Sequence, residues 1–90
     1  MAQAIVNPQH VLQFAQTLKR YSSDVSSQTS DVNAKLHSLG ETWRDQEYQK
    51  FAKEFETAIR AIKRFVTAGD GYHRYLVRKA EAAQAYLDRQ

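Results

Sequence analysis

The side chains able to take part in chemistry are few and lie far apart along the chain. The three histidines are His10, His37 and His73. None of them has a second imidazole, a cysteine or an acidic cluster three or four residues away, as a metal site on a helix would require. The serines from Ser22 to Ser30 lack the elbow turn, oxyanion loop and positioned histidine of a catalytic nucleophile. We therefore expect no enzyme activity, no metal and no cofactor.

Charged residues are distributed unevenly, and this gives the chain one candidate binding surface. Up to Asp45 four basic side chains balance four acidic ones, whereas six basic side chains and one acid, Asp70, lie between Arg60 and Lys79. The residues of this predicted basic face are Arg60, Lys63, Arg64, Arg74 and Arg78. A net charge of +3 on 90 residues is ordinary and by itself identifies no partner.

Three interpretations of the basic face stay open. It is the solvated outer side of a helix, with Arg60 paired to Glu56 and Lys53 to Glu56 or Glu54, or it contacts an acidic protein. In the third interpretation the cations neutralise phosphates while Tyr72 and Tyr75 stack on bases, which would make the chain a basic helical nucleic-acid-binding protein. Nucleic acid is the least favoured of the three.

Length and composition predict one small helical domain over residues 1–90. A chain of this size buries only about 60% of the surface that it exposes when unfolded, and without cysteine it has no disulfide to compensate. No apolar run approaches the roughly 18 residues of a membrane span. The first residues lack the basic start and apolar stretch of a signal peptide. We expect secretion without a conventional leader, or otherwise a cytoplasmic location.

The first predicted helix covers residues 8–39. Asn7 is the expected N-cap, Pro8 suits the first helical position, and Ile5 or Val6 is expected to pack onto Val11 or Leu12. Apolar residues then recur every seven positions at Val11, Leu18, Val25, Val32 and Leu39. The serine-rich middle favours a loop by propensity, but a loop would break this register, so we predict a continuous helix.

A turn is predicted at about residues 40–43. Gly40 is the expected left-handed C-terminal cap of the first helix. Thr42 is the expected N-cap of the second helix, with Asp45 reaching back to it as in a capping box. Trp43 lies between the two helices, where its indole can cover the open end of a two-helix core.

The second predicted helix covers about residues 43–88. Its seven-residue series is Tyr48, Phe55, Ile62, Gly69, Leu76 and Ala83, and beside it run Phe51, Ala58, Phe65, Tyr72 and Tyr86. The Gly69-Asp70-Gly71 segment offers an alternative in which the helix breaks and three helices form. Since the apolar residues keep their phase across these glycines, we predict one helix, with a kink there as a further alternative.

These patterns predict an all-α protein, an antiparallel two-helix hairpin that dimerises into a four-helix bundle. Two helices share only one seam, so the broad apolar stripe of the second helix requires further helices to cover it. The residues assigned to the core and dimer seam are Val11, Leu18, Val25, Val32, Leu39, Phe51, Phe55, Ile62, Phe65 and Leu76.

The turn and its flanks resemble the WXG family, the early secretory antigen-like helical hairpins of type VII (Esx) secretion systems. The family's Trp-x-Gly tripeptide corresponds here to Trp43-Arg44-Asp45, with aspartate in place of glycine. The resemblance extends to Leu39 before the tripeptide and to Tyr48, Phe51 and Phe55 after it. It implies a secreted, virulence-associated substrate or carrier that binds another copy or a related hairpin, with Trp43 and Asp45 as the turn motif.

The same resemblance implies contact with the secretion machinery through a composite export signal. In the family this signal combines the Trp-x-Gly turn with a C-terminal Tyr-x-x-x-Asp/Glu sequence on the partner chain. This chain departs from that pattern, because Gln90 stands four residues after Tyr86. The departure fits a protein that is carried out by a tagged partner, or a relative of the family that lies outside the standard system.

Overall fold

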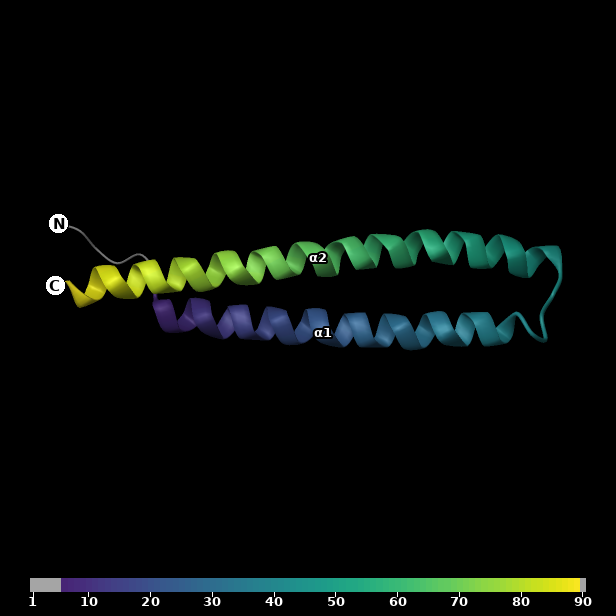
Figure 1. The fold of residues 1–90 in the computed structure, drawn as a ribbon, viewed down its shortest axis with the longest axis horizontal. Coiled ribbons are helices and arrows are strands. Elements are labelled where there is room, and N and C mark those ends of the chain that lie inside the picture. Colours follow the sequence, from purple (N-terminus) through teal and green to yellow (C-terminus); the bar gives the residue numbers. More distant parts are fainter. Residues whose placement is uncertain (1–5, 90) are drawn as a thin grey trace. The chain divides into compact units, whose positions relative to one another are not determined.

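Two long α-helices make up nearly all of the described chain. The computed structural model describes residues 6–89, and the predictions that involve Ile5 and Gln90 lie outside the described residues. Helix α1 is Pro8–Leu39 and helix α2 is Gln46–Asp88, joined by a short turn (Figure 1). The described residues contain no strand. The predicted all-α helical hairpin is confirmed.

Both helices contribute to two compact units, which are described separately. One unit consists of Met1–Ser22 and Ala68–Gln90 and is named the terminal unit. The other is Ser23–Thr67 and is named the turn unit, because it contains the connection between the helices. Within each unit a segment of α1 packs against a segment of α2.

The start of α1 follows the predicted capping pattern. The backbone N–H of His10 donates to Oδ1 of Asn7 (3.2 Å), and the backbone N–H of Val11 donates to the Asn7 carbonyl (3.1 Å). Pro8 occupies the first helical position, where its lack of an N–H leaves no hydrogen bond unmade. Asn7 is therefore the N-cap of α1.

Neither helix is interrupted at its weakest segment. Helix α1 continues through the serine-rich stretch from Ser22 to Ser30, and α2 continues through Gly69 and Gly71. A Cβ built on Gly69 would lie 2.7 Å from Oγ of Ser22. The glycine is thus required by a close helix contact in the terminal unit and does not break the helix.

Small side chains form the core of the terminal unit. Ala15 is 0% exposed, Ala80 is 1% exposed and Ser22 is 3% exposed. Gly69 is also buried. Because these residues are small, the two helix backbones approach closely, and the unit has correspondingly little apolar side-chain volume to bury.

The turn unit has a core of larger side chains. Leu36 on α1 and Ile59 on α2 are buried. Val25 and Phe55 are half-buried beside them. In the described residues no large side chain is fully buried in either unit. The helix pair therefore leaves much of its apolar surface in contact with solvent.

The turn differs from the prediction in two ways. No described glycine has a positive φ, so Gly40 is not a left-handed cap. The chain leaves α1 through tight turns instead, in which the Leu39 carbonyl accepts hydrogen bonds from the backbone N–H groups of Thr42 (3.2 Å) and Trp43 (2.9 Å). These bonds satisfy the last carbonyls of the helix without a left-handed residue.

The N-cap of α2 is Asp45, and the prediction of Thr42 was wrong. The backbone N–H of Tyr48 donates to Oδ1 of Asp45 (3.0 Å), and that of Gln49 donates to the Asp45 carbonyl (3.3 Å). The hydroxyl of Thr42 donates back to the Leu39 carbonyl (3.4 Å). Thr42 therefore belongs to the end of α1, and α2 begins at Gln46 rather than at about residue 43.

Candidate interaction surface

Trp43 lies at the end of a run of aromatic rings in the turn unit. Its indole meets the ring of Tyr48 edge-on, with centroids 5.4 Å apart, and stacks on Phe51 at 6.4 Å. Phe51 in turn contacts Phe55 at 5.7 Å. Trp43 is half-buried, whereas Phe51 is 43% exposed. The indole is thus continuous with an apolar surface that extends along α2.

Tyr48 holds the position of this aromatic run. Its hydroxyl donates to the carbonyl of Leu36 across the turn, with an O···O distance of 2.6 Å. A Cβ built on Gly40 would lie 2.7 Å from the Tyr48 hydroxyl oxygen. Glycine at position 40 therefore makes room for the tyrosine ring, and the tyrosine ties the start of α2 to the end of α1.

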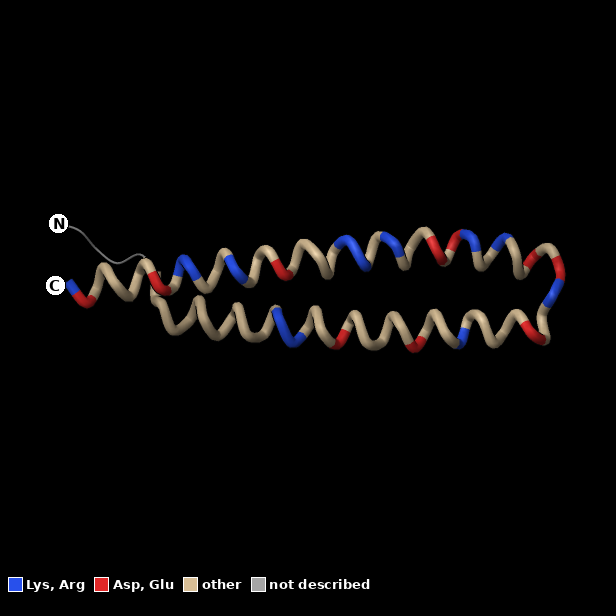
Figure 2. Tube along the Cα trace, in the orientation of Figure 1, with Lys and Arg blue, Asp and Glu red and all other residues tan. Residues whose placement is uncertain are grey.

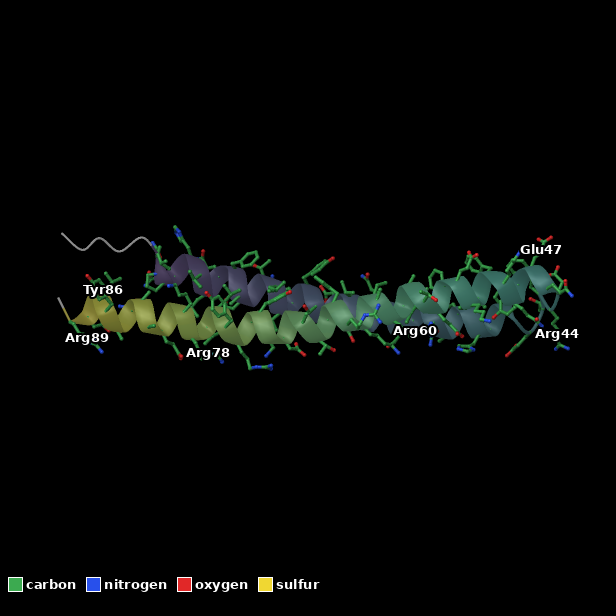
Figure 3. All side chains as sticks on the ribbon, turned by 90° about the horizontal axis from the view of Figure 1, so that it is seen from above. Arg44, Glu47, Arg60, Arg78, Tyr86 and Arg89 are labelled. Atoms are coloured by element: carbon green, nitrogen blue, oxygen red, sulfur yellow. The ribbon has the colours of Figure 1, made fainter. Side chains whose placement is uncertain are left out.

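Polar groups at the turn give Asp45 a structural role. Oδ1 of Asp45 caps α2, and Nε of Arg44 donates to the Glu41 carbonyl (3.0 Å). Figure 3 labels Arg44 and Glu47 at this turn. An aspartate at an N-cap is stabilising by both its hydrogen bond and its charge near the helix N-terminus.

An apolar face lies beside the helix contact of the turn unit. The exposed apolar side chains that define it are Val32, Leu39, Phe51, Ile62 and Phe65. Next to it is an apolar groove of about 260 Å³ between α1 and α2, lined by Val25, Gln28, Thr29, Val32, Phe55, Ile59 and Ile62. A groove of this size accepts apolar side chains from a second helix.

The terminal unit also exposes large apolar side chains. Phe14 and Tyr21 are seven residues apart on α1, and Tyr72 and Tyr86 are fourteen apart on α2, so each pair lies on one face of its helix. All four are more than a third exposed. Each unit thus presents apolar surface next to its own helix contact.

The structure divides the residues predicted for the core and dimer seam into two groups. Val11, Leu18, Val25, Phe55 and Leu76 are half-buried. Val32, Leu39, Phe51, Ile62 and Phe65 are exposed. The first group borders the contact between the two helices, and the second group is the apolar face of the turn unit.

The predicted basic face is divided between the two units. Arg60, Lys63 and Arg64 belong to the turn unit, whereas Arg74 and Arg78 belong to the terminal unit. Figure 2 shows that Lys and Arg are concentrated on α2. In the described residues Arg60 donates to Oγ1 of Thr57 (3.3 Å) and forms no ion pair with Glu56.

Several residues of the helix contact have no place in the predicted seam. Ala15, Ser22 and Ala80 are the most buried of them. Ala15 and Ser22 are seven residues apart on α1, and Ala80 stands 21 residues, or three sevens, after the buried Ile59 on α2. Their spacing carried a signal, but alanine and serine do not stand out as core residues in a sequence. The hydrogen bond from Tyr48 to Leu36 had no sequence signal.

The described residues contain neither a metal site nor a membrane-spanning helix. Among the described residues no three His, Cys, Asp or Glu side chains gather in a way that would hold a metal ion. Neither described helix contains a segment apolar enough, over the length required, to cross a membrane.

Comparison with known proteins identifies the family. No curated protein matches the chain. A family described as proteins of 100 residues with WXG matches residues 3–88, which include both helices and the turn with Trp43. The chain belongs to the WXG100 family.

Proposed function

We propose that the protein is a binding component of a type VII secretion system and acts without catalysis. It is a secreted substrate or a carrier that pairs with a second helical hairpin, for which another copy of this chain suffices. Two helices from each hairpin then form a four-helix bundle. Family membership supports the link to secretion, and the exposed apolar face supports the pairing.

The amount of exposed surface supports the need for a partner. In the turn unit the large apolar side chains of Val32, Leu39, Phe51, Ile62 and Phe65 are each between 37% and 45% exposed. A contiguous apolar surface left in water is typical of a site that a partner covers. A second hairpin would remove much of it from water, and burying apolar area stabilises an assembly by about 25 cal/mol per Å².

The apolar groove is the observation that carries the proposal. Val32 forms one wall on α1, and Phe55 and Ile62 form the other on α2, so the groove is open to side chains of an approaching helix. Val32 is 45% exposed in the single chain. Packing of ridges into such grooves is how helices of a bundle associate.

Trp43 is proposed as the recognition residue of the secretion machinery. Its stacking on Phe51 connects the turn to the apolar face. A partner seated on that face would order Phe51 and, through it, the indole. The secretion machinery would then bind a paired hairpin in preference to a free one.

Export from the native host tests the role of the indole. Replacing Trp43 with alanine should reduce export while the far-UV circular dichroism keeps its helical form, because the core residues Leu36 and Ile59 are untouched. Arg44→Ala is the matched control in the same turn and should be exported normally. Unchanged export of Trp43→Ala would remove the recognition role.

A further inference from the structure

A second groove of the turn unit has a polar lining. It measures about 320 Å³ and lies between α1 and α2, lined by Ser26, Thr29, Ser30, Asn33, Ile62, Lys63, Val66 and Thr67. Ser26, Ser30 and Asn33 are spaced four and three residues apart and so share one side of α1. Val25 and Val32, which line the apolar groove, lie on another side of that helix. The two grooves share Thr29 and Ile62, and the rest of the polar lining is absent from the apolar groove.

The polar groups of this groove have unused hydrogen-bonding capacity. Thr67 donates to the Lys63 carbonyl (3.1 Å), as an ordinary helical threonine does. Within the described residues the side chains of Ser26, Thr29, Ser30 and Asn33 make no hydrogen bond to the protein. The groove thus offers three hydroxyls and one amide to a ligand.

Lys63 is the one cation of the groove lining. Arg60, three residues before Lys63, and Arg64, one residue after it, are exposed on the same helix (Figure 3 labels Arg60). No carboxylate in the described part of the chain lies within ion-pair distance of these side chains. Their charge is available to a partner.

The lining is suited to a carboxylate on a short carbon stem. Lys63 and the hydroxyls of Ser30 and Thr29 can donate hydrogen bonds to a carboxylate. Hydrogen bonds with a charged partner are stronger than those between neutral groups. Ile62 and Val66 supply apolar contact for the methylene groups of a glutamate or aspartate. The shape, polarity and charge of the groove therefore all favour an acidic side chain as its ligand.

Nucleic acid fits this site less well. Tight phosphate binding depends on many cationic contacts, and the lining of the groove contains a single cation, Lys63. Binding of single strands relies on rings on which bases stack. The lining contains no aromatic residue.

From these observations we propose that the polar groove binds an acidic segment of a partner protein. A glutamate or aspartate of that segment enters beside Lys63 and is flanked by Arg60 and Arg64. The partner is distinct from the second hairpin, because Ser26, Ser30 and Lys63 line the polar groove and not the apolar one. The site does not depend on the proposed pairing.

Titration of the purified protein with a defined peptide tests this site. The probe is a fluorescent helical peptide of about 15 residues with glutamates every three to four positions, compared with its glutamine analogue. The glutamate peptide should bind and the analogue should not. Lys63→Gln should weaken binding about fivefold, whereas Lys19→Gln, which removes an exposed cation of the terminal unit, should leave it unchanged.

A charge-neutral variant separates the groove from general electrostatic attraction. Ser30→Leu keeps every charge but fills the groove. It should weaken binding of the glutamate peptide as much as Lys63→Gln does. Amide NMR shifts on adding the peptide should fall on residues 26–33 and 60–67. Equal binding by Ser30→Leu and the unaltered protein, or tighter binding of a labelled DNA duplex than of the peptide, would overturn the proposal.

Discussion

Replacement of Ser22 by alanine should stabilise the protein. Its Oγ is buried and has no hydrogen-bond partner in the described structure, and such a group costs about 1–3 kcal/mol of desolvation. Alanine also favours the helix over serine by about 0.5 kcal/mol. We expect a gain of about 1–2 kcal/mol, or a rise in Tm of about 4–8 °C per kcal/mol.

A substitution at Gly69 provides a second test of the same contact, because Gly69 faces the Ser22 hydroxyl. Alanine at position 69 gains about 1 kcal/mol of helix propensity, but its Cβ would lie 2.7 Å from Oγ of Ser22. Overpacking of this kind costs about 1–3 kcal/mol, so Gly69→Ala alone should destabilise. With alanine at position 22 the nearest remaining atom would be the Cβ, at the 3.8 Å found for Ser22, and Gly69→Ala should then stabilise.

Urea unfolding followed by circular dichroism measures both changes and their coupling. All four proteins are compared at the same chain concentration, because association alters apparent stability. The coupling between the two positions should be about 1–2 kcal/mol, within the range for residues in contact. If the two changes in unfolding free energy were simply additive, Ser22 and Gly69 would not be in contact. A loss of stability in Ser22→Ala would mean that its hydroxyl is hydrogen-bonded.

Three further changes test the turn and the apolar face. Asp45→Ala should lower the unfolding free energy by about 1 kcal/mol and Asp45→Gly by a few tenths, because glycine is tolerated as an N-cap; urea unfolding that ranks the two variants in the opposite order would contradict the capping role. Tyr48→Phe should cost about 1 kcal/mol through loss of the bond to the Leu36 carbonyl, and an unchanged unfolding midpoint would show that the bond contributes nothing. Val32→Asp should reduce the mass measured by light scattering to that of a single chain, since a carboxylate would be buried without a partner, while Ser27→Asp on the exposed side of α1 should not; equal masses for both would argue against the apolar groove as the pairing surface.

Sequence patterns predicted the helices well because periodicity is a property of whole segments. The serine-rich stretch and Gly69 are weak helix formers. Val25 nevertheless keeps the register of Leu18 and Leu39, and Leu76 keeps the phase of Phe65 across the glycine, which predicted continuous helices; the structure has them. Tertiary contacts that override propensity leave this signature in the spacing of apolar residues.

Details of packing and capping were not predictable in the same way. The helix contact of the terminal unit uses Ala15, Ser22 and Ala80, which are small and polar or weakly apolar, so hydrophobicity does not mark them. Thr42 and Asp45 are both good N-caps, and the sequence does not say which one the backbone uses. The choice depends on how the Leu39 carbonyl is satisfied at the end of α1, which only the three-dimensional turn reveals.

The mass of the purified protein in solution at micromolar concentration is the most direct test of the central claim, that the apolar face is completed by a second hairpin. Light scattering or sedimentation equilibrium should give twice the mass of one chain, with dissociation on dilution. A mass of one chain at every concentration, with the helices intact by circular dichroism, would contradict the account.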